Sequence, residues 1–329
     1  MSTNTSLHRS RATLVSLAAG VTALGLVGSA THAAMLASDN AGNYTAALST
    51  GSTGGYGFGS WTVLASNNVG NPSGPYAGTY LDTSGKPIAV ASSKNTWGVY
   101  ANTGTSTATP RIDLFRPFNN ALAAGETFSA ALESDSVGSD VYGGPPATYH
   151  SNGLPAYGFS LQSGSAATVT AGTTPMTVGT SSYNAGSYTN PNAVFTFSLT
   201  ELGPGETLNG QSNSGGYAME TNITDASGTR STLSGLTAAQ IGGGVTAAFS
   251  LGAGGTYTLT LTSVGATPTL LDTYTGTISG AINGVDLFTQ ATAQNGYFNS
   301  LAIVPEPATM SLFIAAGAGL LLLRRRRTA

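Results

Sequence analysis

The 329-residue chain contains no cysteine, so disulfides, thiolate nucleophiles and cysteine-ligated zinc sites are excluded. The lipid-modified cysteine of bacterial lipoproteins is excluded for the same reason. Only 8% of the residues are charged, against about 25% in typical soluble domains. Water must therefore be held at the surface by hydroxyl, amide and backbone groups rather than by ion pairs.

Basic residues are especially scarce in the middle of the chain. Positions 34–303 carry five basic and thirteen acidic residues, a net charge of −8, and the other six basic residues lie near the two ends. This sign of charge excludes nucleic-acid binding, which needs a basic surface. The middle also contains a single histidine, His150, so a Ser-His-Asp triad would depend on it. His150 lies in a Gly/Pro-rich segment, and we interpret it as a loop residue. No phosphate-binding glycine motif is present, and no cofactor is expected.

The N-terminus has the three-part layout of a secretory signal peptide. Arg9 and Arg11 precede an apolar run at 12–27, and small residues follow. Ala33 is small enough to lie directly before the cleaved bond, so we predict a signal helix over 1–33 that signal peptidase removes after Ala33. No adjacent arginine pair precedes the apolar run, which favours the Sec translocon. An uncleaved anchor is the alternative.

The C-terminus has a second apolar run with an unusual flank. Pro305, Glu306 and Pro307 precede sixteen uncharged residues at 308–323, and Arg324, Arg325, Arg326 and Arg327 follow. Such a run forms a transmembrane helix of about 24 Å, slightly shorter than a ~30 Å hydrocarbon core. The positive-inside rule places the arginines in the cytoplasm and the chain before Pro305 outside.

This order of motif, helix and arginine cluster over 304–329 resembles the PEP-CTERM sorting signal. The resemblance implies a Gram-negative producer of extracellular polysaccharide and processing by an exosortase, a membrane-embedded, cysteine-dependent, transpeptidase-like enzyme. It also implies that Pro305, Glu306 and Pro307 are the recognition residues. Processing near them would release the exported part or re-attach it at the cell surface. An ordinary single-pass anchor preceded by a chance motif is the alternative.

Residues 34–303 form the exported body, and their pattern predicts an all-β fold. Residues 193–200 and 256–262 alternate apolar and hydroxyl side chains, which is typical of antiparallel strands with one buried face. Together with frequent Gly, Asn and Pro turns, this favours a β-sandwich or jelly roll. Partial disorder of Gly/Ser-rich stretches is the alternative. Weaker strand signals occur at 61–65, 87–91, 97–100, 111–115, 127–133, 157–162 and 297–303, and a short helix capped by Ser234 is predicted at 234–241.

Two further patterns occur in the body. One pattern recurs in the body: a leucine, a glycine turn and a hydroxyl-rich strand start, at 122–129, 251–258 and, in part, 202–208. Each copy predicts a tight turn that leads into a strand. The alternative is that the copies mark two related half-sheets. Segments 58–61, 97–102, 116–128 and 298–301 resemble a β-rich extracellular domain found with this sorting tag. That resemblance implies no particular activity.

Candidate ligand-binding residues in the body are few. Glu133, Asp135 and Asp140 are close in sequence and could ligate Ca²⁺, serve as catalytic carboxylates or remain solvated loop acids. Trp61, Trp97 and fourteen tyrosines could stack on sugar rings where they are exposed. Core packing is the simpler expectation for the two tryptophans.

Three functions remain open, in this order. The first is a non-enzymatic surface or matrix protein associated with exopolysaccharide, which predicts no convergent carboxylate pair. The second is a carbohydrate-binding, lectin-like module, which predicts a platform with at least two exposed aromatic rings. The third is a polysaccharide hydrolase, which predicts a cleft with two carboxylates.

Overall fold

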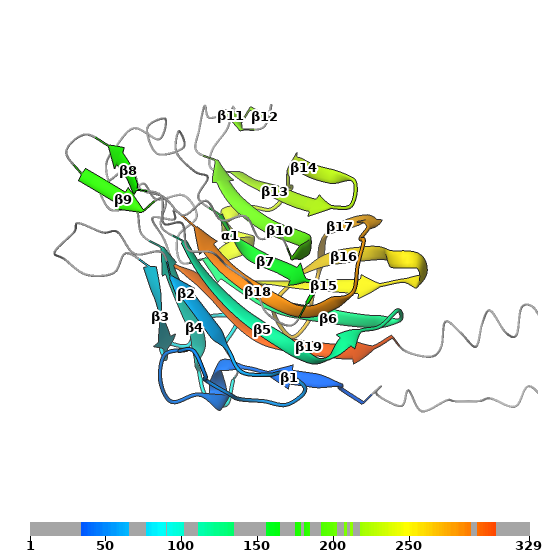
Figure 1. Cartoon of the computed structure of the whole chain (residues 1–329), viewed down its shortest axis with the longest axis horizontal. Helices are drawn as coiled ribbons and strands as arrows, with labels where there is room; N and C mark the ends of the chain where they lie inside the picture. The colour runs from blue at the N-terminus through cyan, green and yellow to red at the C-terminus, as the bar shows by residue number, and fades with distance from the viewer. Residues whose placement is uncertain are drawn as a thin grey trace, which may run out of the picture. The chain divides into compact units, whose positions relative to one another are not determined.

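The computed structural model describes residues 34–65, 77–89, 91–101, 111–134, 156–164, 175–178, 181–184, 192–202, 207–208, 211–212, 218–290 and 295–306. Most of these residues belong to two antiparallel sheets (Figure 1). The first, eight-stranded sheet has the order β17 (Leu270–Thr277), β16 (Thr256–Ser263), β15 (Val245–Leu251), β6 (Glu126–Ser134), β19 (Gly296–Pro305), β4 (Thr96–Ala101) and β3 (Ala77–Asp82), and β1 (Ala37–Asp39) also pairs with β19. The second, seven-stranded sheet has the order β14 (Gly228–Leu233), β13 (Ala218–Asp225), β10 (Ala193–Leu202), β7 (Ala156–Gln162), β18 (Ile282–Gln290), β5 (Arg111–Leu122) and β2 (Thr62–Ala65).

The two sheets pack face to face around one hydrophobic core. Aromatic rings join them: the ring centroids of Phe128 and Phe159 are 5.5 Å apart, and those of Phe195 and Phe249 are 4.7 Å apart. Such pairs add about 0.5–1.5 kcal/mol to the effect of burial. The inward faces of the two clearest predicted strands are confirmed as core, with exposed fractions of 3% or less for Phe195, Phe197, Leu199, Tyr257, Leu259 and Leu261.

The all-β prediction is therefore confirmed, together with most of the individual strand predictions. Six predicted segments fall in observed strands: 61–65 in β2, 97–100 in β4, 111–115 in β5, 127–133 in β6, 157–162 in β7 and 297–303 in β19. Two small two-stranded sheets consist of β8 (Pro175–Val178) with β9 (Ser181–Asn184) and β11 (Thr207–Leu208) with β12 (Gln211–Ser212).

The strand predicted at 87–91 is wrong. Residues 87–89 and 91 form turns, and the amide of Ala89 donates to the carbonyl oxygen of Lys86 at 2.8 Å. Side chains rather than a neighbouring strand bind the backbone of Ile88, whose amide donates to Glu133 and whose carbonyl accepts from Asn299. The apolar run is explained by the side chain of Ile88, which is buried beside Tyr297.

The predicted helix exists but begins later than expected. Helix α1 spans Ala238–Gly242 and its N-cap is Thr237, which forms a capping box with Gln240. The hydroxyl of Ser234 instead donates to the carbonyl oxygen of Met219, so it anchors the end of β14 and is not available as a cap.

Two of the three predicted glycine turns are confirmed. Gly125, at φ +83°, closes the turn between β5 and β6, and the 3-10 turn η3 (Ala253–Gly255) links β15 to β16. The backbone at Gly125 is in the left-handed region, which glycine adopts without the steric penalty of a Cβ atom. In the third copy β10 ends at Leu202 and β11 begins at Thr207, and 203–206 lie outside the described residues.

The first and last strands of the body lie side by side (Figure 1). Strand β1 pairs antiparallel with β19, and the amide of Leu36 donates to the carbonyl oxygen of Ile303 at 2.8 Å. Both described ends of the chain therefore leave the same end of the sandwich. Strand β19 continues past position 303 and ends at Pro305, the first residue of the predicted sorting motif.

Two predicted segments lie outside the described residues. The first is the signal peptide with Ala33, and the second comprises Pro307, the apolar run and Arg324 to Arg327. Within the described part of the chain, no helix combines the length and apolar character needed to cross a membrane.

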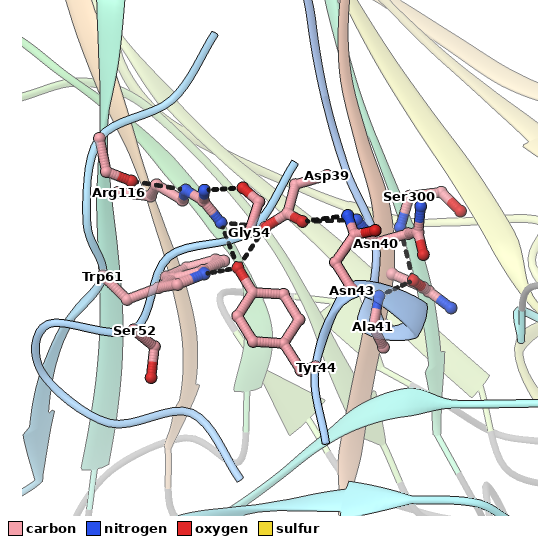
Figure 2. A network of polar contacts seen from close by, with 12 residues as sticks. Asp39, Asn40, Ala41, Asn43, Tyr44, Ser52, Gly54, Trp61, Arg116 and Ser300 are labelled. Carbon is pink, nitrogen blue, oxygen red and sulfur yellow. Dashed lines mark hydrogen bonds and ion pairs between the residues drawn. The ribbon is translucent and has the colours of Figure 1, made fainter. Parts of the chain in front are cut away.

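A buried ion pair joins the two sheets near β1 (Figure 2). Arg116 on β5 points into the core and pairs with Asp39 on β1, and both side chains are fully buried. Two carbonyl oxygens accept from the guanidinium group, that of Gly59 at 3.0 Å and that of Gly54 at 2.5 Å. The guanidinium carbon also lies 4.9 Å from the ring centroid of Trp61, a cation–π contact.

Tyr44 completes this network. Its hydroxyl donates to Asp39 at 2.6 Å and accepts from the indole nitrogen of Trp61 at 2.8 Å and from Arg116 at 2.7 Å. Burial, followed by the hydrogen bond to Asp39, raises the pKa of Tyr44 to about 12. The phenol therefore stays protonated and acts as a fixed connector between carboxylate, guanidinium and indole.

Asn299 holds β19 in place beside this network. Its buried amide accepts from the backbone of Ala41, in the 3-10 turn η1 (Ala41–Asn43), and donates to the carbonyl oxygens of Ile88 and Asn95, all at 2.9 Å. Ser300, at φ +53°, follows at the irregularity where the register of β19 shifts. One side chain thus ties three backbone segments to the last strand.

Asp39→Asn should lower the free energy of unfolding by about 3–5 kcal/mol, because it leaves a buried guanidinium group without its counter-charge. Urea denaturation followed by tryptophan fluorescence measures the change. Replacing both partners, Asp39→Asn with Arg116→Met, should cost less than the sum of the two single substitutions. Additive losses would contradict a coupled buried pair.

Candidate functional site

Two tyrosine side chains lie on the outer face of the first sheet. Tyr80 on β3 and Tyr100 on β4 are partly exposed, and their ring centroids are 6.3 Å apart. Each ring lies over a glycine of the neighbouring strand: a Cβ atom on Gly98 would come within 2.4 Å of the Tyr80 ring, and one on Gly78 within 2.5 Å of the Tyr100 hydroxyl. The glycines therefore leave room for both tyrosine side chains to lie against the sheet.

Tyr297 and Lys86 support these rings from the side. The hydroxyl of Tyr80 donates to that of Tyr297 at 2.8 Å, and the ammonium nitrogen of Lys86 lies 4.3 Å from the Tyr297 ring centroid. Tyr297 and Tyr80 flank Gly98 from the two neighbouring strands. We name Tyr80, Tyr100 and Tyr297 the tyrosine platform. Tyr297 is buried, at 2% exposure, so only Tyr80 and Tyr100 of this platform can reach a ligand. Partly exposed rings with hydroxyl groups at their edges are suited to contact both apolar and hydroxyl surfaces of a ligand.

A carboxylate pair lies on the outer face of the second sheet. Asp286 on β18 and Asp113 on β5 share a hydrogen bond, and their exposed fractions are 0% and 1%. Arg111 binds Asp113 through two nitrogens at 2.6 and 2.9 Å and donates to Gln290 at 3.0 Å. Its guanidinium group lies 4.3 Å from the Phe288 ring centroid.

Burial, and then the negative charge of Asp113, raises the pKa of Asp286 well above its ordinary value. A hydrogen bond between two carboxyl groups needs one proton, and Asp286 is the group that retains it. Glycosidases hold their two carboxyl groups about 5–10 Å apart, with the substrate between them. Asp113 and Asp286 touch one another and are shielded from solvent, so they do not fit that arrangement.

The hypothesis of a non-enzymatic surface protein predicts no convergent carboxylate pair. Asp113 and Asp286 do converge, so this prediction is not met. Their neighbours indicate a structural role: Arg111 neutralises Asp113, and the proton neutralises Asp286. The pair therefore links β5 to β18.

The aromatic candidates from the sequence divide clearly. Trp61 and Trp97 are fully buried with ring centroids 5.4 Å apart, so core packing is confirmed and neither can stack on a sugar. The most exposed of the tyrosines whose side chains are described is Tyr56, at 53%, beside β1. Its hydroxyl donates to the carbonyl oxygen of Met35, whose side chain is also exposed. The tyrosine platform was not predicted individually, although tyrosine as a residue type was.

The acidic candidates do not assemble into a site within the described residues. Glu133 is buried, 3% exposed, and its carboxylate accepts from the amide of Ile88. Asp135, Asp140 and His150 lie outside the described residues. Within the ranges that the structure describes, no three acidic or histidine side chains come together as metal ligands.

The start of the predicted sorting motif lies against the sandwich. Pro305 pairs with Glu126 at the beginning of β6, and the amide of Glu306 donates to the carbonyl oxygen of Gly125 at 2.6 Å. Glu306 is exposed. Two of the three predicted recognition residues are thus held in place by the body itself, whereas Pro307 is outside the described part of the chain.

A sequence signal for the tyrosine platform does exist. The segments 78–80 and 98–100 both read Gly-x-Tyr, and they lie on neighbouring antiparallel strands. Antiparallel pairing places the glycine of one copy opposite the tyrosine of the other. No comparable local signal marks the pair Asp113 and Asp286, which depends on the pairing of β5 with β18.

No family model and no curated protein matches this chain. Among solved structures, the catalytic domain of a glycoside hydrolase family 131 protein from Coprinopsis cinerea is similar at a TM-score of 0.41 and 15% identity, over 83% of this chain and 95% of that one. The globular domain of T. cruzi calreticulin gives 0.39 and 9% over 78% and 89%. The Ca²⁺- and Man3GlcNAc-bound exoplasmic/lumenal domain of VIP36 gives 0.38 and 6% over 74% and 83%. Similarity of this degree identifies no shared activity.

The stability of the protein should depend on pH through Asp286. A raised pKa means that the folded state binds the proton more tightly than the unfolded chain does, so the associated stability is complete below about pH 3.9 and declines as the pH rises through the folded pKa. Asp286→Asn replaces the titrating carboxyl group with an amide that does not titrate. The free energy of unfolding of the variant relative to the wild type should therefore increase from pH 4 to pH 8 in urea titrations. A difference that stays constant with pH would contradict the raised pKa.

Proposed function

We propose that this chain is an exported, non-enzymatic cell-surface or extracellular-matrix protein, sorted by its C-terminal PEP motif, that contacts exopolysaccharide through its tyrosine platform. The tyrosine platform carries this proposal. Tyr80 and Tyr100 are partly exposed, and Gly98 and Gly78 leave room for them against the sheet. The flat faces suit the C–H surfaces of pyranose rings, and the phenol groups suit their hydroxyls.

The low charge of the body supports a neutral or weakly charged polymer as the ligand. Only 8% of the residues are charged, and the body has a net negative charge. Electrostatic attraction to an acidic polymer is therefore weak, and recognition depends on stacking and hydrogen bonds. The buried, neutralised pair Asp113 and Asp286 supports binding without hydrolysis.

The position of the motif supports a surface-held body. Strand β19 enters the motif at Pro305 without an intervening linker. A membrane segment or covalent attachment that follows the motif would hold the sandwich next to that anchor. The N-terminal end of the body lies beside Ile303, at the same end of the sandwich as Pro305. The tyrosine platform lies on the outer face of the first sheet.

Removing the platform rings should weaken polysaccharide binding. Tyr80→Ala with Tyr100→Ala should reduce affinity for purified exopolysaccharide of the producing strain at least about tenfold, which corresponds to ~1.4 kcal/mol. Gly98→Ala, which displaces the Tyr80 ring and keeps both tyrosines, should reduce affinity in the same direction. Affinity electrophoresis in gels containing the polysaccharide measures the retention.

Tyr56→Ala is the matched control, because it removes an exposed tyrosine away from the tyrosine platform. It should leave retention unchanged. Equal retention of the platform variant and the wild type would overturn the proposed polysaccharide contact. Circular dichroism melting curves establish that each variant is folded.

Replacing Pro305, Glu306 and Pro307 by alanine should abolish processing, because these are the expected recognition residues. Cell fractionation and mass spectrometry of both termini compare the variant with the wild type. The wild type should lose Arg324 to Arg327 and reach the surface or matrix, whereas the variant should keep them and stay in the membrane. Identical termini and location for the two proteins would leave a simple membrane anchor as the explanation.

A further inference from the structure

The sorting motif begins inside the folded body, and this has a consequence for where the chain can be cut. Strand β19 stays in register with β6 through Val304, which pairs with Thr127, and Pro305, which pairs with Glu126. The amide of Glu306 then donates to the carbonyl oxygen of Gly125 at 2.6 Å. The backbone is thus engaged up to the second residue of the motif.

The acceptor of this last bond is itself held in a tight turn. Gly125 has φ +83°, and its amide donates to the carbonyl oxygen of Leu251 at 2.7 Å. The carboxylate of Glu126 accepts from the amide of Ala123 at 2.8 Å and closes the turn. The Gly125 carbonyl is therefore a fixed contact for Glu306 rather than a chance one.

The strand is also held upstream. Asn299 is fully buried, and its amide contacts three backbone segments, as described above. Strand β1 pairs with residues 301–303 on the side opposite β6. Freeing the end of β19 for an enzyme would therefore require local opening of the sheet edge, and segments with more hydrogen bonds and burial open less often.

Resting on the proposed function, we infer that the folded body sets the N-terminal limit of processing. The cut falls on the carboxyl side of Glu306, so the mature body keeps Pro305 and Glu306. Enzymes that process peptides commonly bind the substrate as an added extended strand, which uses its main-chain hydrogen bonds. Residues whose backbone already pairs with β6 are not available for this, whereas the chain beyond Glu306 is not engaged by these contacts.

The reaction breaks one peptide C–N bond. The C-terminal fragment leaves with a new α-amine, which takes up a proton. The carbonyl carbon of the last body residue bonds to the oxygen of water, giving a carboxylate, or to an oxygen or nitrogen of an acceptor hydroxyl or amine, giving an ester or an amide. The nitrogen of the leaving fragment takes up the proton that the incoming water, hydroxyl or amine loses. Where water attacks, the new carboxylic acid then releases its remaining proton to the solvent, and no oxidant or reductant is needed.

The full-length protein, isolated from the producing cells, provides the test. Mass spectrometry of its C-terminal peptide should show that the mature body ends at Glu306 or later. A body that ends before Glu306 would overturn the inference and leave the sorting proposal intact. Retention of Arg324 to Arg327 on all of the protein would instead overturn the sorting proposal, and the inference with it.

An insertion distinguishes a limit set by the body from one set by the enzyme. Gly-Ser-Gly-Ser between Val304 and Pro305 moves the motif away from β6 and should produce additional ends within the insert or at Pro305. The same insertion between Ser227 and Gly228, in the turn that links β13 to β14, is the control and should leave the cut unchanged. A single unchanged cut in both variants would show that the enzyme alone sets the position and would overturn the inference.

Discussion

The sandwich depends on the buried pair Arg116 and Asp39, which is a contact between its two sheets. Removing two charges from water costs several kcal/mol for each ion, and only thorough hydrogen bonding offsets that cost. Here the guanidinium group donates to a carboxylate, a phenol and two carbonyl oxygens, while Asp39 also accepts from Tyr44 and from Asn43. Because β1 carries Asp39, the pair also fixes the strand that flanks β19.

The rest of the molecule has few charged residues, and its outer faces carry hydroxyl groups and aromatic rings instead. On the outer face of the first sheet, Thr258 faces Thr275 and Thr260 faces Thr273 on neighbouring strands. Cross-strand hydroxyl pairs of this kind contribute a few tenths of a kcal/mol and keep the surface hydrated. The tyrosine platform occupies another part of the same sheet, so a weakly charged surface combines hydroxyl rows with flat aromatic rings.

The fold class could be predicted from the sequence because alternation is a local property. Strands β10 and β16 alternate strictly, and their inward residues are the core. Strand β15 alternates as well, but small residues such as Ala247 and Ala248 weaken the contrast between its faces, and the strand was not predicted. The apolar segment after Lys86 shows the reverse error, since its backbone is bound by side chains of distant strands.

The site was less predictable, because it depends on register. Tyr80 lies over Gly98 only because β3 and β4 pair with that offset, and Asp113 meets Asp286 only because β18 lies between β5 and β7. Burial also decides what a residue type can do. Trp61 and Trp97 could stack on a sugar ring only if they were exposed, and both pack in the core. The motif at Pro305 was predicted from its residues, whereas the contact of Glu306 with Gly125 depends on the three-dimensional arrangement.

The place of β19 in the sheet also determines the order in which the molecule can be assembled. Of the described strands, β19 is the last in the sequence, yet it lies between β6 on one side and β4 and β1 on the other. Until it arrives, strands β3, β4 and β1 have no hydrogen-bonded connection to the β6, β15, β16 and β17 part of their sheet, so a nascent chain exposes two unfinished edges. Closing a sheet through its last strand requires contacts between residues far apart in sequence, which is slow. The first sheet can consequently be completed only after the residues that lead into Pro305 are available.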